Sequence, residues 1–335
     1  MRRLRLSAAA LVAASLVLAG CSGDESEPED SPEAQEVTGG ELLDSTWPLT
    51  GLPVTGDASA AQDHPVLVTK IDNTSSSSPQ LGLGTADLVV EELVEGGMTR
   101  LAVFHYSDIP ETAGPVRSMR ASDIGIVSPV DASVVTSGAA GQTIARVKKA
   151  GIPFFGEGSK GVYRDTGRSA PYNLFANLSD VVSAATQDEE VRPDDYLPWG
   201  ESGDLPKGKK AGSLAASFGG HTTNWKFQGG SYTNLNTYAK QGDEFEADNV
   251  LVLRVKVGDA GYRDPAGNFV PETKFEGKGE ALLFHDGKVV RGTWSKNGLK
   301  DALNLKTKKG KLTVPAGHTW IELVPAADGN VTFKK

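Results

Sequence analysis

The stretch that decides the fold is ADLVVEELVEGGMTRLAVFHYSDIPETAGPVRSMRASD, residues 86–123. It carries the densest β-type apolar pattern in the chain, and its β-branched residues favour strands. We predict two adjacent strands, at 87–94 and 99–106, joined by a turn at Gly96-Gly97. A helix over 87–94 is the alternative, because the glutamates of that segment would also suit a helix face.

Strand and helix patterns alternate on both sides of this stretch. Before residue 213 the expected strands are 65–71 and 133–136, and the expected helices are 119–127, 142–150 and 178–185. We assign Ser118 as the N-cap of the first of these helices. Short strand patterns separated by turns dominate after residue 213. The predicted fold class is therefore α+β, with a mixed sheet and helices in the first part and a mostly antiparallel, β-rich second part.

The first twenty residues have the features of a targeting segment. Three arginines precede an apolar run over 6–18, and Cys21 follows directly after small residues. This arrangement resembles a bacterial lipoprotein signal, which implies removal of residues 1–20 and a lipid anchor on Cys21. An ordinary cleaved signal beside a chance cysteine is the alternative. We therefore expect the protein at the extracytoplasmic face of the bacterial cell membrane.

Composition divides the rest of the chain into further segments. Residues 22–35 are rich in charge, proline and serine, and on this basis we predict a disordered tether over 21–45. The polar segment 191–212 is rich in proline and glycine, and it is a predicted linker or long surface loop. It would separate an N-terminal α+β domain at 46–190 from a C-terminal β-rich domain at 213–335.

The overall composition excludes several classes of protein. The net charge is −9 and no basic stripe is visible, so we expect no nucleic-acid partner. Cys21 is the only cysteine, which excludes internal disulfides and thiolate metal clusters. The histidines are scattered without metal-site spacing, and we expect no metal and no cofactor. The expected partners are the membrane, through the lipid anchor, and a cell-wall component or another envelope protein.

The segment GPVRSMR, residues 114–120, predicts an anion-binding site. Its Gly-Pro turn leads into the expected helix start, where free backbone N–H groups favour an anion. Arg117 and Arg120 could reach the same place and bind a carboxylate or a phosphate. The alternative is that both arginines pair with carboxylates of the protein itself, namely Glu91, Glu92, Glu95 or Asp123.

Two further sets of residues are candidates for function. The other predicted ligand-binding residues are Arg100, Arg164, Arg168 and Tyr172. The candidates for general acid or base catalysis are Glu91, Glu92, His105 and Asp123. If 87–94 is a strand, Glu91 and Glu92 face opposite sides of the sheet, so only one of them can serve a given cleft. Plain surface charge is the alternative for each glutamate.

Several motifs occur together in the order of one known family. They are PLTGLP (48–53), PVLVTKIDN (65–73), GPVRSMRASD (114–123), RSAPYNLF (168–175), NVLVLRV (249–255) and a long match over 292–325. With the stretch at 81–108, they make the chain resemble the YerB-type family of bacterial lipoproteins, whose two halves are described as a domain of unknown function with N- and C-terminal parts. The resemblance covers nearly all of 47–325. It implies an extracytoplasmic lipoprotein of two α/β-containing parts, with no established catalytic activity.

Two functions follow from these residues. The first is a lipid-anchored cell-envelope protein that binds an anionic ligand or partner, such as cell-wall material, in an Arg-lined cleft. The second is a hydrolase of cell-wall polymer that uses a carboxylate or a histidine as acid or base. If Arg117 and Arg120 are fully sealed by carboxylates with no cleft above them, the first function is ruled out. If all the acid–base candidates are exposed or far from any pocket, the second is ruled out.

Overall fold

The structure is a computed structural model that describes residues 45–335. The predicted signal peptide, the lipidation site Cys21 and nearly all of the predicted tether lie outside the described residues. β-Strands are the commonest regular secondary structure of the described chain, and helices are few and short.

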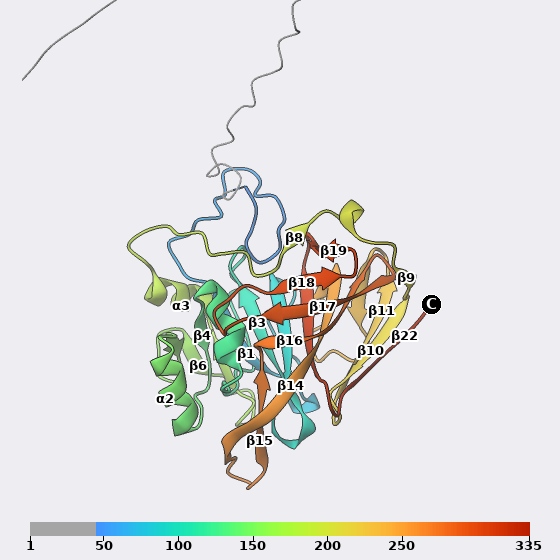
Figure 1. Ribbon diagram of the computed structural model, residues 1–335. Coiled ribbons are helices and arrows are strands. Elements are labelled where there is room, and N and C mark those ends of the chain that lie inside the picture. Colours follow the sequence, from blue (N-terminus) through green and yellow to red (C-terminus); the bar gives the residue numbers. More distant parts are fainter. Residues whose placement is uncertain (1–44) are drawn as a thin grey trace, which may run out of the picture. The chain divides into compact units, whose positions relative to one another are not determined.

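A sheet of thirteen strands forms the centre of the fold (Figure 1). Its spatial order is β19-β18-β17-β16-β14-β21-β2-β3-β1-β4-β5, with β15 paired to β14 and β9 paired to β17. The strands are β1 (Leu67–Asp72), β2 (Leu88–Leu93), β3 (Thr99–His105), β4 (Ser133–Val135), β5 (Phe154–Phe155), β9 (Lys209–Lys210), β14 (Asn249–Arg263), β15 (Phe269–Lys274), β16 (Gly277–His285), β17 (Lys288–Lys296), β18 (Asn304–Thr307), β19 (Gly310–Lys311) and β21 (Thr319–Pro325).

Six strands in the middle of this sheet share one direction. β14, β21 and β2 are parallel, and so are β1, β4 and β5. β3 lies between β2 and β1 and is antiparallel to both, so these two groups of strands point the same way. The carboxyl ends of all six strands therefore meet at one edge of the sheet.

A second, five-stranded sheet packs on one face of the central sheet. It is antiparallel throughout, in the order β13-β12-β11-β10-β22. Its strands are β10 (Ser213–Ser217), β11 (Thr222–Gln228), β12 (Ser231–Asn234), β13 (Glu246–Ala247) and β22 (Asn330–Lys334). The interface is apolar and includes an edge-to-face pair of Trp225 and Trp320 with ring centroids 5.1 Å apart.

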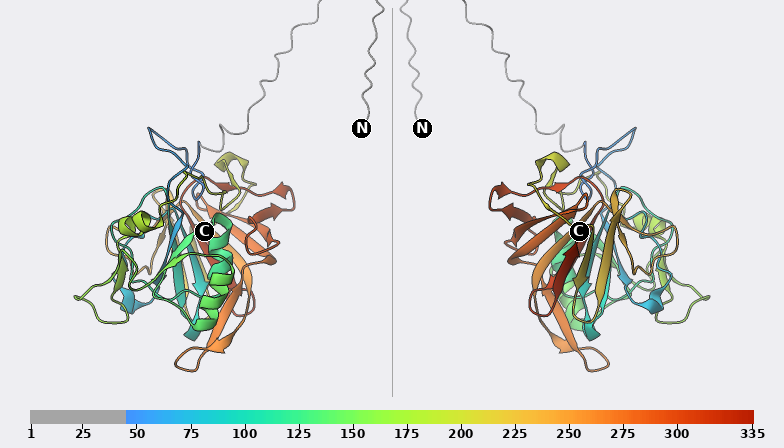
Figure 2. Two further views of the ribbon diagram at one scale, coloured as in Figure 1. Left: turned by 90° about the vertical axis from the view of Figure 1, so that its left-hand side faces the viewer. Right: turned by 90° about the vertical axis from the view of Figure 1, so that its right-hand side faces the viewer.

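Short helices and irregular segments cover other parts of the central sheet. The helices are α1 (Asp123–Val127), α2 (Gly141–Lys149) and α3 (Leu178–Ala185), with 3-10 turns η1 (Ser75–Ser77), η2 (Glu95–Gly97), η3 (Ser128–Val130) and η4 (Ser202–Asp204). α1 and α2 pack on the face opposite the second sheet, and Figure 2 shows α2 (green) lying along the sheet. Two small sheets complete the fold: β20 (Val314–Pro315) with β8 (Trp199–Gly200), and β6 (Val162–Arg164) with β7 (Leu174–Ala176).

The β2–β3 prediction is confirmed, and alternation along β2 divides its residues between two cores. Val90 packs with the core under α1 and α2, whereas Val89 packs with the core under the second sheet. Glu92 shares the side of Val90 and Glu91 shares the side of Val89, as strand geometry requires. The turn between the strands contains Gly96 and Gly97 at φ 71° and 73°, a conformation that glycine adopts without strain.

The predicted helix over 119–127 is wrong in its first half. The helix α1 begins only at Asp123, its N-cap is Ser122, and Ser118 lies outside it. The preceding residues continue the hydrogen bonding of the sheet instead, since Arg117 N donates to Lys70 O and Ser137 N donates to Arg117 O. The predictions for 142–150 and 178–185 are confirmed by α2 and α3.

The two parts that the sequence analysis separates at 191–212 contribute to the same sheet. β21 and β14 come from the second part, and β21 pairs directly with β2 from the first part. The segment 191–212 contains η4 and two short strands, β8 and β9. The domain boundary stays a prediction, while the backbone pairing joins both parts through the centre of the sheet.

The N-terminus of α3 offers a test of the local structure. Asn177 caps this helix, because its Oδ1 accepts a hydrogen bond from Asp180 N at 3.0 Å. We expect Asn177→Ala to lower the free energy of unfolding by about 1 kcal/mol, since the N–H of Asp180 loses its acceptor. Denaturant unfolding measures this change, and Ser179→Ala is the matched control in the first turn. Equal stability of Asn177→Ala and Ser179→Ala would contradict this capping role.

Candidate functional site

A cluster of arginines lies where the carboxyl ends of the parallel strands meet. Asp72 ends β1, Glu95 follows β2, and Arg100 stands near the start of the antiparallel strand β3. Asp72 and Arg100 are also cross-strand partners in the β1–β3 ladder. The sheet topology therefore brings these three charged groups to one edge, which is where open α/β sheets commonly bind ligands.

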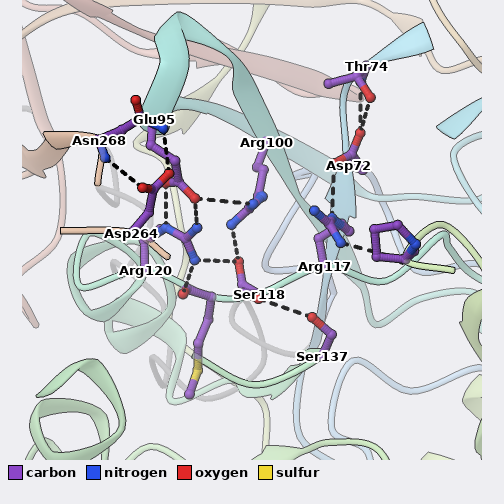
Figure 3. A network of polar contacts seen from close by, with 12 residues as sticks. Asp72, Thr74, Glu95, Arg100, Arg117, Ser118, Arg120, Ser137, Asp264 and Asn268 are labelled. Carbon is purple, nitrogen blue, oxygen red and sulfur yellow. Dashed lines mark hydrogen bonds and ion pairs between the residues drawn. The ribbon is translucent and has the colours of Figure 1, made fainter. Parts of the chain in front are cut away.

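The GPVRSMR segment crosses the same edge. Its backbone bonds to the end of β1 and to the loop after β4, where Met119 N donates to Gly138 O at 3.0 Å. This path places Arg117 and Arg120 beside Arg100. We call Arg100, Arg117 and Arg120, together with Asp72 and Glu95, the arginine edge (Figure 3).

Arg120 is occupied by the protein's own carboxylate. Its guanidinium binds both oxygens of Glu95, with Nε 2.9 Å from Oε2, and its Nη1 donates to Met119 O at 2.9 Å. Burial opposes ionisation of Glu95, but Arg120 and Arg100 outweigh it and lower the pKa of this carboxyl. The alternative in which an arginine pairs internally therefore holds for Arg120.

Arg100 is a buried guanidinium with incomplete pairing. Its Nη1 donates to Ser118 O at 2.8 Å, and its Nη2 lies 3.6 Å from Glu95 Oε1. Within the described chain, no acceptor meets its buried Nε. Burial and the positive charge of the neighbouring Arg120 lower the pKa of Arg100 to about 10. A second anion beside this group would stabilise its charge.

Arg117 is the member of the arginine edge that solvent can reach. Its side chain is 21 % exposed. Its Nε donates to Asp72 Oδ2 at 3.1 Å, and its guanidinium carbon lies 5.2 Å from the ring centroid of Tyr172. Figure 3 shows the Arg100 side chain pointing to Ser118, while Arg117 lies apart from it, below Asp72. Of the predicted ligand-binding residues, Tyr172 therefore does lie against Arg117.

The other two predicted arginines bind elsewhere. Arg164 is exposed and forms a paired hydrogen bond to Glu157, as well as a bond to Asn173 Oδ1 at 2.7 Å. Arg168 donates to the backbone carbonyls of Ser77, Ser78 and Pro79. Both side chains hold loops together, and neither is hydrogen-bonded to a residue of the arginine edge.

A buried ion cluster lies behind the arginine edge. Lys70 is fully buried and contacts Glu92 Oε1 at 2.8 Å and Asp123 Oδ1 at 2.7 Å. Burial and the charge of Asp123 raise the pKa of Glu92 to about 7, against the opposing effect of Lys70. This cluster has one carboxylate more than it has cations, and it fixes α1 to β1 and β2.

A second pair of buried carboxylates lies on the opposite face of the sheet. Glu91 and Glu322 are direct neighbours in the parallel β2–β21 ladder, and both are fully buried. Glu91 accepts hydrogen bonds from Asn73 and Thr223, while Glu322 accepts one from Trp225 Nε1 at 2.8 Å. Burial and then the charge of Glu91 raise the pKa of Glu322 well above its usual value. The pair joins the central sheet to β11.

His105 is a neutral core histidine. It is fully buried on β3, and its Nε2 lies 2.7 Å from Gly82 O. Burial lowers its pKa to about 4, so the ring is uncharged at neutral pH and Nε2 donates to the carbonyl. The four acid–base candidates, Glu91, Glu92, His105 and Asp123, are at most 1 % exposed and have internal partners. A polymer substrate cannot reach them in this structure.

Two charged groups that matter here were not singled out by the sequence analysis. Lys70 and Glu322 each lie inside an apolar strand pattern, LVTKID and TWIELVP. A charge inside a run that otherwise reads as a buried strand is the signal that could have revealed them.

Residues 45–335 also bear on metal binding and membrane binding. No group of three or more His, Cys, Asp or Glu side chains in that range could hold a metal ion. No helix in the same range is long and apolar enough to cross a membrane.

Comparison with known proteins supports the predicted resemblance. The family model described as "Protein of unknown function (DUF3048) N-terminal domain" matches residues 49–192, and its C-terminal counterpart matches residues 214–321. "Putative lipoprotein YerB" of Bacillus subtilis (strain 168) is 25% identical over 306 residues, which cover 84% of this chain and 86% of that protein. The crystal structure of YerB protein from Bacillus subtilis has a TM-score of 0.70 at 20% sequence identity, covering 86% of this chain and 99% of that chain. At that identity the structural likeness shows the fold alone.

Proposed function

The chain belongs to the DUF3048 family, whose function is unknown, and on that premise we propose that it binds an anionic ligand at the arginine edge. The observation that carries the proposal is the incomplete pairing of a buried guanidinium group. The buried Nε of Arg100 has no acceptor among the described residues, and Glu95, which lies 3.6 Å from its Nη2, already binds Arg120.

The chemistry of the site favours a carboxylate or a phosphate. Guanidinium groups present a planar pair of donors that matches the two oxygens of such anions. The loop at 137–140 leads from β4 into the N-terminus of α2 at the same edge, and Ala140 provides no side-chain cap there. The free backbone N–H groups and the dipole of α2 add to the preference for an anion. The ring of Tyr172 can pack beside an apolar part of the ligand.

The predicted lipid anchor on Cys21 indicates where in the cell the arginine edge lies. A relative with the printed name "Putative lipoprotein YerB" supports a lipid-anchored protein of the cell envelope. In that case Cys21 carries the lipid, and the folded part faces the extracytoplasmic side of the membrane. Cell-wall material is rich in carboxylate and phosphate groups, so a cell-wall component is the ligand class that we propose.

Calorimetric titration of the full-length chain tests the proposal. The probes are inorganic phosphate and soluble anionic cell-wall fragments. We expect Arg117→Gln to weaken binding at least about tenfold, since a charge-assisted bond contributes about 1.5–3 kcal/mol. Thermal unfolding should change little, because the Arg117 side chain is partly exposed.

Arg291→Gln is the matched control, since Arg291 is an exposed arginine that also binds a carboxylate, Glu280. It should bind the probes as the wild type does. Equal binding by Arg117→Gln and Arg291→Gln, or no binding of any probe by the wild type, would refute the proposal.

A further inference from the structure

A serine, a histidine and an asparagine form a hydrogen-bonded chain at the opposite edge of the central sheet. His285 ends β16, Asn249 begins β14, and Ser202 begins η4. Ser202 Oγ lies 3.0 Å from His285 Nε2, and His285 Nδ1 lies 3.0 Å from Asn249 Oδ1. From Asn249, β14 runs toward the β14–β15 hairpin, which Figure 1 shows at the bottom.

The surroundings of Asn249 determine which imidazole nitrogen carries the proton. Asn249 is fully buried, and its Nδ2 donates to Pro315 O at 2.9 Å and to Thr319 Oγ1 at 3.1 Å. The Thr319 hydroxyl donates its hydrogen to Gly317 O, so Thr319 Oγ1 can only accept a hydrogen bond from Asn249. The amide orientation is thereby fixed, and Oδ1 faces His285.

His285 Nδ1 therefore has two acceptors, Asn249 Oδ1 and the backbone carbonyl of Asp248 at 3.2 Å. In the neutral ring Nδ1 must carry the proton, and Nε2 is left with a free lone pair toward Ser202. This is the order nucleophile, base and orienting group that activates a serine.

Ser202 and His285 also line a pocket of about 650 Å³. Apolar side chains form part of its wall, namely Leu205, Leu283 and Val290. The lining also contains more positive than negative groups. The cations are Lys207, Lys210 and Lys288, and the carboxylate is that of Asp286, which forms an ion pair with Lys288. The volume suits a small molecule, and the lining favours one with an apolar part and a negative charge.

We propose that Ser202, His285 and Asn249 form a catalytic site that hydrolyses small anionic esters with an apolar part. Ser202 Oγ attacks the ester carbonyl carbon while His285 Nε2 accepts the hydroxyl proton. The tetrahedral intermediate then expels the alcohol, which takes the proton from Nε2 and leaves an acyl group on Ser202. A water molecule then attacks the acyl group while His285 Nε2 accepts its proton. The second tetrahedral intermediate expels Ser202 Oγ, which takes the proton back, and the products are the carboxylic acid and free Ser202. The lysines of the pocket favour the developing oxyanion.

Covalent labelling of the full-length chain tests the nucleophile. A fluorophosphonate probe should form one adduct per chain, which peptide mass spectrometry locates on Ser202. Ser202→Ala should lose the adduct, and Ser179→Ala, a change at an exposed serine of α3, should keep it. Absence of an adduct on Ser202 of the folded wild-type chain would overturn the proposal.

Ester hydrolysis tests the base and the substrate class. With mono-p-nitrophenyl succinate as the probe, Ser202→Ala and His285→Gln should each lower kcat/KM by about 10²–10⁴-fold. Neutral p-nitrophenyl butyrate should have a higher KM than the anionic ester, and Lys210→Ala should reduce that difference. Unchanged kcat/KM in both Ser202→Ala and His285→Gln would overturn the proposal.

Asn249 is a positioning residue, and nitrogen NMR of the His285 ring tests its role. In the wild type, Nδ1 should be protonated and Nε2 unprotonated at a pH where the ring is neutral. Asn249→Ala should populate both tautomers and lower kcat more than it changes KM. A ring in which Nε2 carries the proton in the wild type would contradict the assignment of His285 as base.

Discussion

Replacing Lys70 by methionine is expected to lower the free energy of unfolding by about 3–5 kcal/mol. Lys70 is fully buried, and its Nζ forms ion pairs with Glu92 at 2.8 Å and with Asp123 at 2.7 Å. Methionine fills a similar volume but leaves two carboxylates together in the core. One or both must then protonate or draw in water, and either response destabilises the contact between α1 and the sheet.

Denaturant unfolding at neutral pH measures this loss. The matched control is Lys288→Met, because Lys288 is an exposed lysine that contacts Asp286 at 2.6 Å. Its expected effect is below about 1 kcal/mol. Combining Lys70→Met with Glu92→Gln should recover part of the lost stability, since one buried charge is removed with its partner. A Lys70→Met chain as stable as the Lys288→Met chain would show that the buried cluster does not stabilise the fold.

Changing Glu322 to glutamine is expected to stabilise the protein increasingly as the pH rises. The pKa of Glu322 is raised in the folded chain by burial and by the charge of Glu91. A carboxyl with a raised folded pKa contributes stability that is complete below its unfolded pKa, near 4.5, and is lost as the pH rises through the folded pKa. Glutamine resembles the protonated form and can still accept from Trp225, so it avoids this loss.

The difference between variant and wild type should therefore be small at pH 4. It should grow above that by at most about 1.4 kcal/mol for each pH unit, until the folded pKa is reached. Unfolding curves of both chains between pH 4 and pH 9 measure it. Glu280→Gln, at an exposed carboxylate that binds Arg291, is the control and should show no such trend. Parallel stability curves for Glu322→Gln and wild type would disprove the raised pKa.

The sequence predicted those features that depend on neighbouring residues. Alternation in LVVEEL placed Glu91 and Glu92 on opposite faces, and the glycine pair marked the β2–β3 turn. The short spacing between Arg117 and Arg120 indicated that both residues belong to one charged region. The structure locates this region at the edge of the sheet where the carboxyl ends of the parallel strands meet. The sequence could not show that Glu95 forms an ion pair with Arg120, because that contact depends on how η2 folds back toward the loop after Pro115.

Features that depend on strand register lay beyond the sequence. Glu91 meets Glu322 because β2 pairs with β21 across more than two hundred residues of chain. Ser202, Asn249 and His285 likewise come together through the β14–β16 pairing and the packing of η4. Neither set has a local motif, since its members are far apart in the chain. The prediction that Ser118 caps a helix was wrong because it relied on a local preference alone. In the structure the neighbouring backbone is hydrogen-bonded to the end of β1 instead of starting a helix.

The most direct test of anion binding at the arginine edge is an NMR titration of the arginine Nε–H signals with inorganic phosphate. The signals of Arg100 and Arg117 are assigned by single Arg→Lys changes, and Arg291 serves as the internal reference. We predict that phosphate shifts the Arg100 and Arg117 signals along one saturable curve while the Arg291 signal stays in place. Signals of Arg100 and Arg117 that move no more than that of Arg291 would contradict the account.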